Sequence, residues 1–300
     1  MTGRTHTIAC LAGDGVGPEL MAEASRALAA VARAHSFELG EVHLTVGREA
    51  LLRYGHPLPS VTRNGYRDVD AILTASPNDL ALDGVRADLD LCWRVTRVPV
   101  GVDGDLVVVG PLGSECHAVA AARAVDIACA RRGRLVAVGA TQEWRDLVNA
   151  EAAERPGVHV EHLSPGEVLA LVSRDPEKLD VVAADEVFVG AVTDAAAVLN
   201  DSQRGVACGW LPEQGPGLFA PSAVDESDVA GFGVTDPTAI LYAAALLLSE
   251  GLGRRPAART LERAVAGLSA GVDTRGAADA VIARLPNTRT DTELFLEARA

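Results

Sequence analysis

Apolar runs of strand length alternate with segments of helical periodicity along most of this chain of 300 residues. Short runs rich in Val, Ile and Leu predict strands, and longer segments with apolar residues three or four apart predict helices. The predicted strands are residues 7–13, 69–75, 106–111, 134–140, 158–163 and 179–185. The predicted helices are residues 18–35, 115–132, 141–154, 164–175, 187–199, 237–252 and 257–268. This alternation predicts an α/β protein with helices packed on a largely parallel sheet.

Glycine, proline and capping residues mark the boundaries of these elements. A glycine-rich turn at residues 13–18 joins the first strand to the first helix. Many nucleotide-binding folds begin in this way, because the N–H groups at a helix start attract phosphate. Ser164, Pro165 and Glu167 form the pattern of a capping box, which indicates a well-defined helix start. Residues 200–233 are rich in Gly and Pro and are predicted to be mostly loops.

Composition and charge exclude several classes of partner. The hydrophobic share of 48% and the charged share of 23% are typical of a soluble globular protein. The net charge of −14 argues against nucleic acid or an anionic membrane as a partner. The longest apolar stretch, residues 239–248, is about half the ~20 residues of a membrane span and is predicted to be a buried helix.

The cysteines are scattered along the chain, without a CxxC pair. They are Cys10, Cys92, Cys116, Cys129 and Cys208. This distribution predicts reduced thiols in a cytoplasmic protein, with neither a disulfide framework nor a zinc site.

In chain order, six segments resemble the isocitrate/isopropylmalate dehydrogenase family of β-decarboxylating dehydrogenases. They are residues 11–28 (LAGDGVGPELMAEASRAL), 55–75, 82–100, 177–199, 228–248 and 288–295. The resemblance implies a two-domain α/β fold, with sheets flanked by helices and an active-site cleft between the domains. The implied first, cofactor-side domain is discontinuous, residues 1–97 plus 202–300. The implied second, smaller domain is residues 98–201 and carries the dimerisation and metal side.

The resemblance fails at the residues that carry the family's chemistry. That reaction moves a hydride from a 2-hydroxy acid to a nicotinamide and then releases CO2, with a divalent cation stabilising the enolate. The aspartate positions for that cation are Pro165 and Gly190 here, and only Asp194 matches. Ala140 stands at the catalytic lysine position. A metal site of the family's kind, for Mg²⁺ or Mn²⁺, is therefore not expected.

The segment after residue 111 is also much shorter than in the family. There the family carries a proton-donating tyrosine and an arm that locks its dimers. The resemblance thus implies a homodimer that lacks this arm.

Part of the family's ligand-binding pattern remains. Arg86 matches a substrate arginine, and Arg97 lies one place from a second arginine position, which Thr96 occupies. Gly110 occupies the position of a third substrate arginine. Both Arg86 and Arg97 are candidate substrate-binding residues, because the guanidinium fork pairs bidentately with a carboxylate. The implied ligand is a small carboxylate.

The adenine loop of the family is partly kept. Asp228 and Asp236 match cofactor positions and are the candidate residues for NAD. Ala223 replaces the loop's histidine, and the acidic Asp225 and Glu226 disfavour the 2′-phosphate of NADP.

Two further groups have a chemical and a plain interpretation. Glu186 and Asp194 lie eight residues apart, on one face of a continuous helix, and with Asp185 form either a relocated metal site or a cleft-facing acidic patch. Among Glu115, Cys116 and His117, one side chain is a candidate nucleophile or base. The alternative is an ordinary helix start. His159 and Glu161 share one strand face, as a site or as a surface pair.

Two functions from different classes stay open. In the first, the chain has lost Mg/NAD-dependent oxidative decarboxylation and is a binding or regulatory pseudoenzyme, or catalyses a different reaction in the old cleft. In the second, it is an active NAD-dependent dehydrogenase that oxidatively decarboxylates an unusual 2-hydroxy acid. The joint departures at the metal, lysine, tyrosine and adenine-loop positions favour the first.

Overall fold

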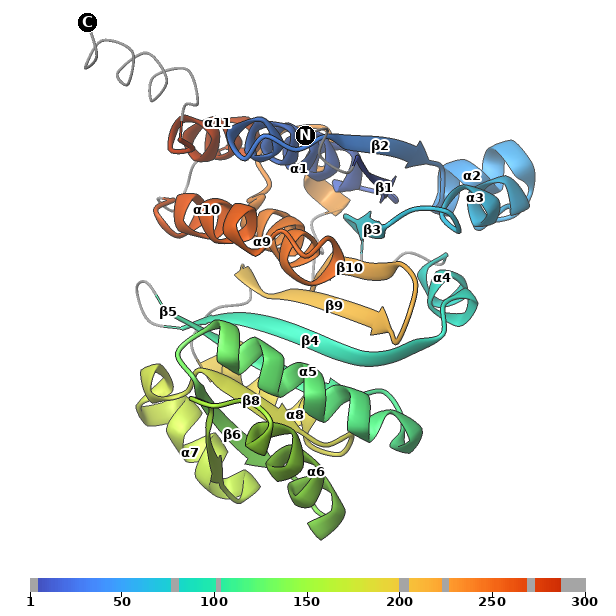
Figure 1. Ribbon diagram of the computed structural model, residues 1–300. Coiled ribbons are helices and arrows are strands. Elements are labelled where there is room, and N and C mark those ends of the chain that lie inside the picture. Colours follow the sequence, from blue (N-terminus) through green and yellow to red (C-terminus); the bar gives the residue numbers. More distant parts are fainter. Residues whose placement is uncertain are drawn as a thin grey trace, which may run out of the picture.

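One ten-stranded sheet runs through the molecule, with helices on both faces (Figure 1). The computed structural model describes residues 5–76, 81–100, 104–199, 205–222, 227–268 and 273–286. The strands are β1 (His6–Leu11), β2 (Leu39–Leu44), β3 (Ala71–Thr74), β4 (Leu91–Val100), β5 (Gly104–Pro111), β6 (Arg134–Val138), β7 (His159–His162), β8 (Val181–Ala184), β9 (Ala207–Pro212) and β10 (Gly217–Pro221).

The helices lie between these strands and after them. The α-helices are α1 (Gly17–Ala34), α2 (Gly47–Tyr54), α3 (Ser60–Gly65), α4 (Leu82–Asp88), α5 (His117–Ala130), α6 (Gln142–Ala153), α7 (Pro165–Arg174), α8 (Val189–Leu199), α9 (Thr238–Leu246), α10 (Arg255–Ala266) and α11 (Thr274–Ala283). Short 3₁₀ turns are η1 (Ser114–Cys116), η2 (Pro176–Lys178) and η4 (Ser227–Val229), and a π-helical turn, η5 (Leu247–Gly251), extends α9.

The strand order is β2-β1-β3-β10-β9-β4-β5-β8-β6-β7. Both outer parts of the sheet are parallel, as predicted, whereas the three central pairs, β10–β9, β9–β4 and β4–β5, are antiparallel. The predicted domain boundary at residues 97 and 98 falls inside β4, which is hydrogen-bonded to both β9 and β5. The division into two domains stays a prediction.

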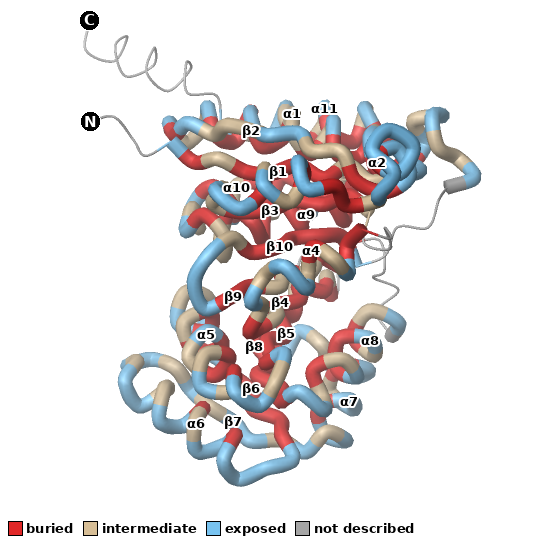
Figure 2. Tube along the Cα trace, turned by 90° about the vertical axis from the view of Figure 1, so that its right-hand side faces the viewer, coloured by how far each residue is buried: buried red, intermediate tan, exposed pale blue. Residues whose placement is uncertain are grey.

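Strand alternation divides the core between the two faces. On β4, Trp93 and Val95 pack into the cluster under α1, α5, α9 and α10, while Val98 and Val100 pack under α7 and α8. Odd and even residues of a strand point to opposite faces, so β4 contributes to both. Figure 2 shows the resulting buried band through the middle strands.

The strands that the sequence pattern does not predict are β2, at the edge of the sheet, and β4, β9 and β10, at its centre. Residues 200–233 hold β9 and β10, although their Gly and Pro content predicted loops. All five residues of β10 are buried, so its short run shows no alternation of apolar and polar positions. The capping box before α7 is confirmed, since the Ser164 side chain accepts from the Glu167 N–H and the Glu167 carboxylate accepts from the Ser164 N–H.

The prediction that residues 239–248 form a buried helix is also confirmed. Every residue of Ala239–Leu246 in α9 is buried. Within the described part of the chain, no helix is both long and apolar enough to cross a bilayer.

The prediction that all cysteines are reduced is wrong for one pair. Cys92 on β4 and Cys116 at the end of η1 form a disulfide across 24 positions of sequence. Widely spaced cysteines give no pairing signal, because only the fold brings this strand beside the start of α5.

Breaking this disulfide is expected to lower the free energy of unfolding. A closed loop of this length constrains the unfolded chain by about 3 kcal/mol. Heat or urea unfolding of Cys92→Ser beside the oxidised protein measures the effect. Cys129→Ser removes an exposed free thiol and is the matched control. An unchanged stability in Cys92→Ser would show that the bond imposes no such constraint.

Candidate functional site

A pocket of about 220 Å³ opens between α4, α8 and the centre of the sheet. It is called the arginine pocket below. Its lining residues are Arg86, Arg94, Thr96, Thr193, Asp194, Cys208, Trp210 and Ser222. The pocket therefore joins two residues predicted from the sequence, Arg86 and Asp194, which are more than one hundred positions apart.

The floor of the arginine pocket consists of two cross-strand pairs. In the antiparallel β4–β9 ladder, Arg94 lies opposite Trp210 and Thr96 lies opposite Cys208. Alternate residues of both strands thus point to the same face. The Thr96 hydroxyl and the Cys208 sulfur are 3.6 Å apart, which closes the floor between the strands.

Arg94 is the residue that the sequence analysis missed. Its Nη2 donates to the backbone oxygen of Val189 (3.2 Å) and to the hydroxyl of Thr193 (3.3 Å), so α8 holds the guanidinium at the pocket. The signal was strand alternation: in a strand over residues 91–100, Arg94 and Thr96 share a face and Arg97 points to the opposite one. The sequence pattern does not predict a strand over residues 91–100.

Arg86 enters from α4 on the other side. Its guanidinium carbon lies 4.5 Å from the centre of the Trp210 ring, and its Nη1 is 3.3 Å from Asp83. The Nε atoms of both Arg86 and Arg94 are buried and have no hydrogen-bond partner among the described residues. Two guanidinium groups therefore line one small cavity, and because their Nε atoms are buried, a ligand there would meet the ends of the two side chains.

The other polar groups leave the pocket electropositive. Asp194 is exposed and stands in the first half of α8. Burial raises the pKa of the Cys208 thiol, an effect that Thr96 and Arg94 only partly offset, so the thiol is neutral near pH 7 and a poor nucleophile. Two guanidinium groups beside one carboxylate give the lining an excess of positive charge, and the guanidinium fork is suited to pairing with carboxylate or phosphate oxygens.

The donor set does not fit a divalent cation. Such an ion takes several oxygen ligands, mostly carboxylates. The arginine pocket offers one carboxylate, on Asp194, beside two positively charged side chains. A third arginine at the Gly110 position has no room either, because a Cβ there would lie 2.5 Å from the Ala184 oxygen.

The proposed acidic cluster near Asp194 does not form. α8 begins at Val189, so Glu186 precedes the helix and shares no helical face with Asp194. The Asp185 carboxylate is buried and accepts from the N–H groups of Ala140, Val187 and Phe188. Its oxygens therefore hold this turn together, and the geometry that the sequence predicted from an unbroken helix is wrong.

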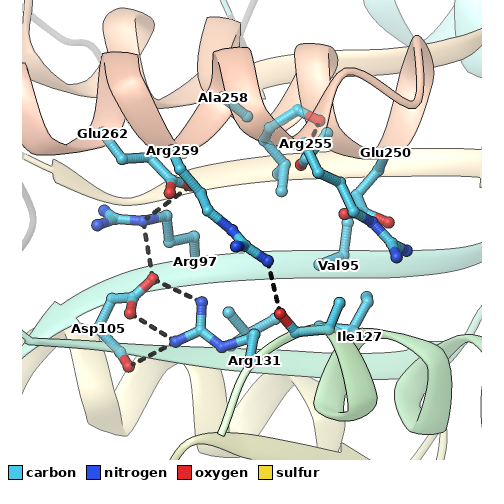
Figure 3. A pocket seen from close by; sticks show the side chains of 14 residues that line it. Val95, Arg97, Asp105, Ile127, Arg131, Glu250, Arg255, Ala258, Arg259 and Glu262 are labelled. Atoms are coloured by element: carbon cyan, nitrogen blue, oxygen red, sulfur yellow. Dashed lines mark hydrogen bonds and ion pairs between the residues drawn. The ribbon is translucent and has the colours of Figure 1, made fainter.

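Arg97 lies on the opposite face of the sheet, in what we call the ion-pair cluster (Figure 3). The cluster consists of Arg97, Asp105, Arg131, Asp180 and Glu262. The Arg97 Nε is 3.0 Å from an Asp105 oxygen, and its guanidinium stacks 3.7 Å from the centre of the Tyr242 ring. The structure thus places Arg97 in a separate, largely buried contact between β4 and α10, and Arg94 occupies the arginine pocket instead.

Opposite charges hold the ion-pair cluster ionised. Arg131 donates to Asp105 (2.6 Å) and to Asp180 (2.8 Å). Burial alone would raise the pKa of Asp105, but Arg97 and Arg131 outweigh it and hold that pKa below its usual range. Burial raises the pKa of Glu262, which Arg97 offsets only in part.

The three candidate catalytic residues before α5 do not form a site together. Cys116 is buried and bonded to Cys92, so it is no nucleophile. His117 contacts the Trp144 ring edge-on, with centroids 5.4 Å apart, and Glu115 is exposed. None of the three lines the arginine pocket. The helix-start interpretation fits these positions.

The two aspartates predicted to bind a cofactor lie in the chain between β10 and α9. Asp228 lies in η4 and is exposed, whereas Asp236 accepts from the Thr238 N–H (2.9 Å) just before α9. The predictions for Ala223, Asp225 and Glu226 lie outside the described residues.

Fold and pocket together define an α/β protein with an arginine-lined pocket beside the centre of its sheet. The family profile of isocitrate/isopropylmalate dehydrogenase matches residues 7–82 and 116–293. The chain belongs to the isocitrate/isopropylmalate dehydrogenase family.

Relatives and solved structures agree with this assignment. The chain is 30% identical to the 3-isopropylmalate dehydrogenase of Synechococcus sp. (strain CC9605), over 89% of this chain and 91% of the relative. It is 28% identical to that of Colwellia psychrerythraea, over 86% and 88%. A β-decarboxylating dehydrogenase from Thermococcus kodakarensis, in its apo form, has the same fold, with a TM-score of 0.81 at 22% identity over 94% and 96% of the two chains.

The family match leaves residues 83–115 uncovered. This stretch holds Arg86 and Arg94, so their role is inferred from the geometry of the pocket. It also includes the direct passage from β5 to η1 and α5, where the sequence analysis expected a shortened connection.

Proposed function

We propose that this protein binds a small carboxylate in the arginine pocket and does not carry out metal-dependent oxidative decarboxylation. The observation that carries the first part is that two guanidinium groups, those of Arg86 and Arg94, line one cavity together with a single carboxylate. A guanidinium fork pairs bidentately with a carboxylate, so a small acid in this cavity would meet two such groups. The cavity of about 220 Å³ suits a small acid.

The second part of the proposal rests on the residues at the family's reactive positions. Pro165 begins α7 and offers no ligand, and Gly190 leaves Asp194 without a second carboxylate on α8. Ala140 is exposed and has no titratable group for proton transfer. A protein with these residues fits a binding or regulatory role, or a reaction that needs only anion recognition.

Calorimetric titration tests the proposal, with malonate, succinate, malate and 2-oxoglutarate as probes. We expect saturable binding of at least one acid without added metal or nucleotide. The same samples are then assayed for NADH formation from the 2-hydroxy acid, with NAD and Mn²⁺ present. Absence of binding by all four acids would contradict the carboxylate proposal, and metal-dependent NADH formation would contradict the proposed loss of activity.

A gain-of-function variant tests the metal argument directly. An added Cβ at Gly190 meets no atom within 4 Å, so Gly190→Asp has room for its side chain. It stands one helical turn from Asp194, on the same face. We expect Mn²⁺ binding, followed by electron paramagnetic resonance, to be tighter in Gly190→Asp than in the unchanged protein by at least about tenfold. Gly190→Asn is the uncharged control.

If the unchanged protein instead binds Mn²⁺ as tightly as Gly190→Asp, and Asp194→Asn abolishes that binding, the metal argument is wrong. The second candidate function, an active NAD-dependent dehydrogenase, would then be preferred. It is favoured by the similarity to relatives that are 3-isopropylmalate dehydrogenases, at 30% identity.

The same proposal includes a homodimer without the family's arm. Exposed apolar side chains lie along α7, α8 and the turn before α8, at Leu169, Val187 and Val198. Exposed apolar side chains along paired helices are typical of protein interfaces. Sedimentation velocity of the unchanged protein measures the assembly.

A further inference from the structure

A cysteine, a glutamate and a histidine meet at one free edge of the sheet. β2 is the edge strand and β1 its neighbour, whereas the strands under the arginine pocket, β4 and β9, stand at the centre. The parallel β1–β2 register sets Cys10 beside His43 and Ile8 beside Glu41. One ligand atom from each of Cys10, Glu41 and His43 lies within 4.8 Å of the other two.

We propose that Cys10, Glu41 and His43 form a binding site for Zn²⁺ or a divalent ion of similar softness. Thiolate sulfur, imidazole nitrogen and carboxylate oxygen are the ligand types of protein zinc sites. Around a tetrahedral ion, such atoms stand about 3 to 4 Å apart, so small side-chain rotations bring the three together. The site is independent of the proposed carboxylate pocket.

The pairing of β1 with β2 already places the three side chains on one face of the sheet. Successive side chains of a strand alternate, so Glu41 and His43 point to the same face of β2, and the register brings Cys10 onto that face from β1. The Glu41 and His43 side chains are in contact, with Oε2 and Nε2 3.1 Å apart. The His43 side chain is 60% exposed, which leaves the fourth coordination position open to water.

The charges of the proposed ligands favour a divalent ion between Cys10, Glu41 and His43. Glu41 has 18% of its side chain exposed, and His43 is the one partner found for its carboxylate among the described residues. A thiolate and a carboxylate would together neutralise the ion, so the loaded site has no net charge at a partly buried position. A neutral assembly avoids most of the cost of burying separate charges.

Metal binding at Cys10 would displace a firmly held proton. Burial, with a further contribution from the Glu41 charge, raises the pKa of the Cys10 thiol to about 12, and a metal ion would replace its proton. The Ser25 hydroxyl on α1 is buried without a hydrogen-bond partner among the described residues, close enough to the Cys10 thiol to lower that pKa. A metal-bound Cys10 thiolate would accept a hydrogen bond from the Ser25 hydroxyl and be oriented by it.

The opposite edge of the sheet holds a natural control. On β7, His159 and Glu161 are both exposed and also stand two residues apart. Their neighbours in the β6 register are Arg134 and Val136, so no thiol completes a ligand set. A histidine–glutamate pair without cysteine is therefore tested in the same molecule.

Cobalt titration of the full, tag-free chain tests the site. Under anaerobic conditions we expect one equivalent of Co²⁺ to give thiolate-to-cobalt charge-transfer absorption, which Zn²⁺ then removes by displacement. Cys10→Ser should abolish this absorption, while Glu41→Gln and His43→Gln should weaken Co²⁺ binding by at least about tenfold. Cys129→Ser and His159→Gln should leave it unchanged.

Two outcomes would overturn the proposal. One is no charge-transfer absorption in the unchanged protein, and the other is an undiminished signal in Cys10→Ser, which would assign the thiolate to another cysteine. Should Cys10→Ser fail to fold, the exposed His43→Gln keeps the test decisive. Zn²⁺ should raise the melting temperature of the unchanged protein but not that of His43→Gln, and an equal rise in both would contradict the site.

Discussion

Asp105→Asn is expected to destabilise the protein by about 3 to 5 kcal/mol, the cost of removing one partner from a buried ion pair. The side chain of Asp105 is 17% exposed, and that of Arg97 only 8%. Without the Asp105 carboxylate, the nearest acidic partner of Arg97 is Glu262, at 3.9 Å. Arg131 keeps its ion pair with Asp180. Urea unfolding measures the loss.

An exposed pair provides the comparison. Asp175 and Lys178 are 2.9 Å apart, with side chains 51% and 66% exposed. Surface pairs of this kind contribute about 0 to 1 kcal/mol, so Asp175→Asn should change stability little. Equal losses in the free energy of unfolding of the two variants would mean that burial does not increase the contribution of the ion-pair cluster to stability.

The same carboxylate should give the stability a pH dependence. Because the folded-state pKa of Asp105 lies below its usual range, its contribution is fully present above the ordinary aspartate pKa of about 3.9. The contribution is lost as pH falls through the lower, folded-state pKa. Asp105→Asn should therefore flatten the fall in stability below about pH 4, and an unchanged slope would assign that fall to other carboxylates.

The helices around the candidate site were largely predictable from sequence. α8 runs over Val189–Leu199 against the predicted 187–199, and α7 begins where its capping box indicated. Local pattern suffices there, because periodicity and caps act within a few residues. The start of α8 mattered, because Glu186 shares a helical face with Asp194 only if the helix is continuous from residue 186, whereas α8 begins at Val189.

The central strands required information that lies far apart in the chain. β4 pairs with β9 across more than one hundred positions, and the glycines and prolines around β9 and β10 resemble loop punctuation. Once β4 is known to be a strand, alternation alone separates Arg94 from Arg97. The ion-pair cluster could not be predicted, because it joins β4, β5, α5 and α10 only after the sheet has formed.

Replacing both pocket arginines should remove carboxylate binding altogether. A hydrogen bond to a charged group contributes about 1.5 to 3 kcal/mol, so Arg94→Gln and Arg86→Gln should each weaken binding by about 10- to 100-fold. The double variant should lose about 3 to 6 kcal/mol of binding free energy if the two contributions add. Titration with the acid that binds the unchanged protein gives these values.

The single variants also separate charge from geometry. Arg94→Lys keeps the positive charge but has no planar fork, and it cannot reproduce the donor contacts to Val189 and Thr193 on α8. If the arginines act by paired hydrogen bonds, Arg94→Lys should bind nearly as weakly as Arg94→Gln. If it binds as tightly as the unchanged protein, a general positive potential would explain the affinity, and the orientation of Arg94 by α8 would have no part in it.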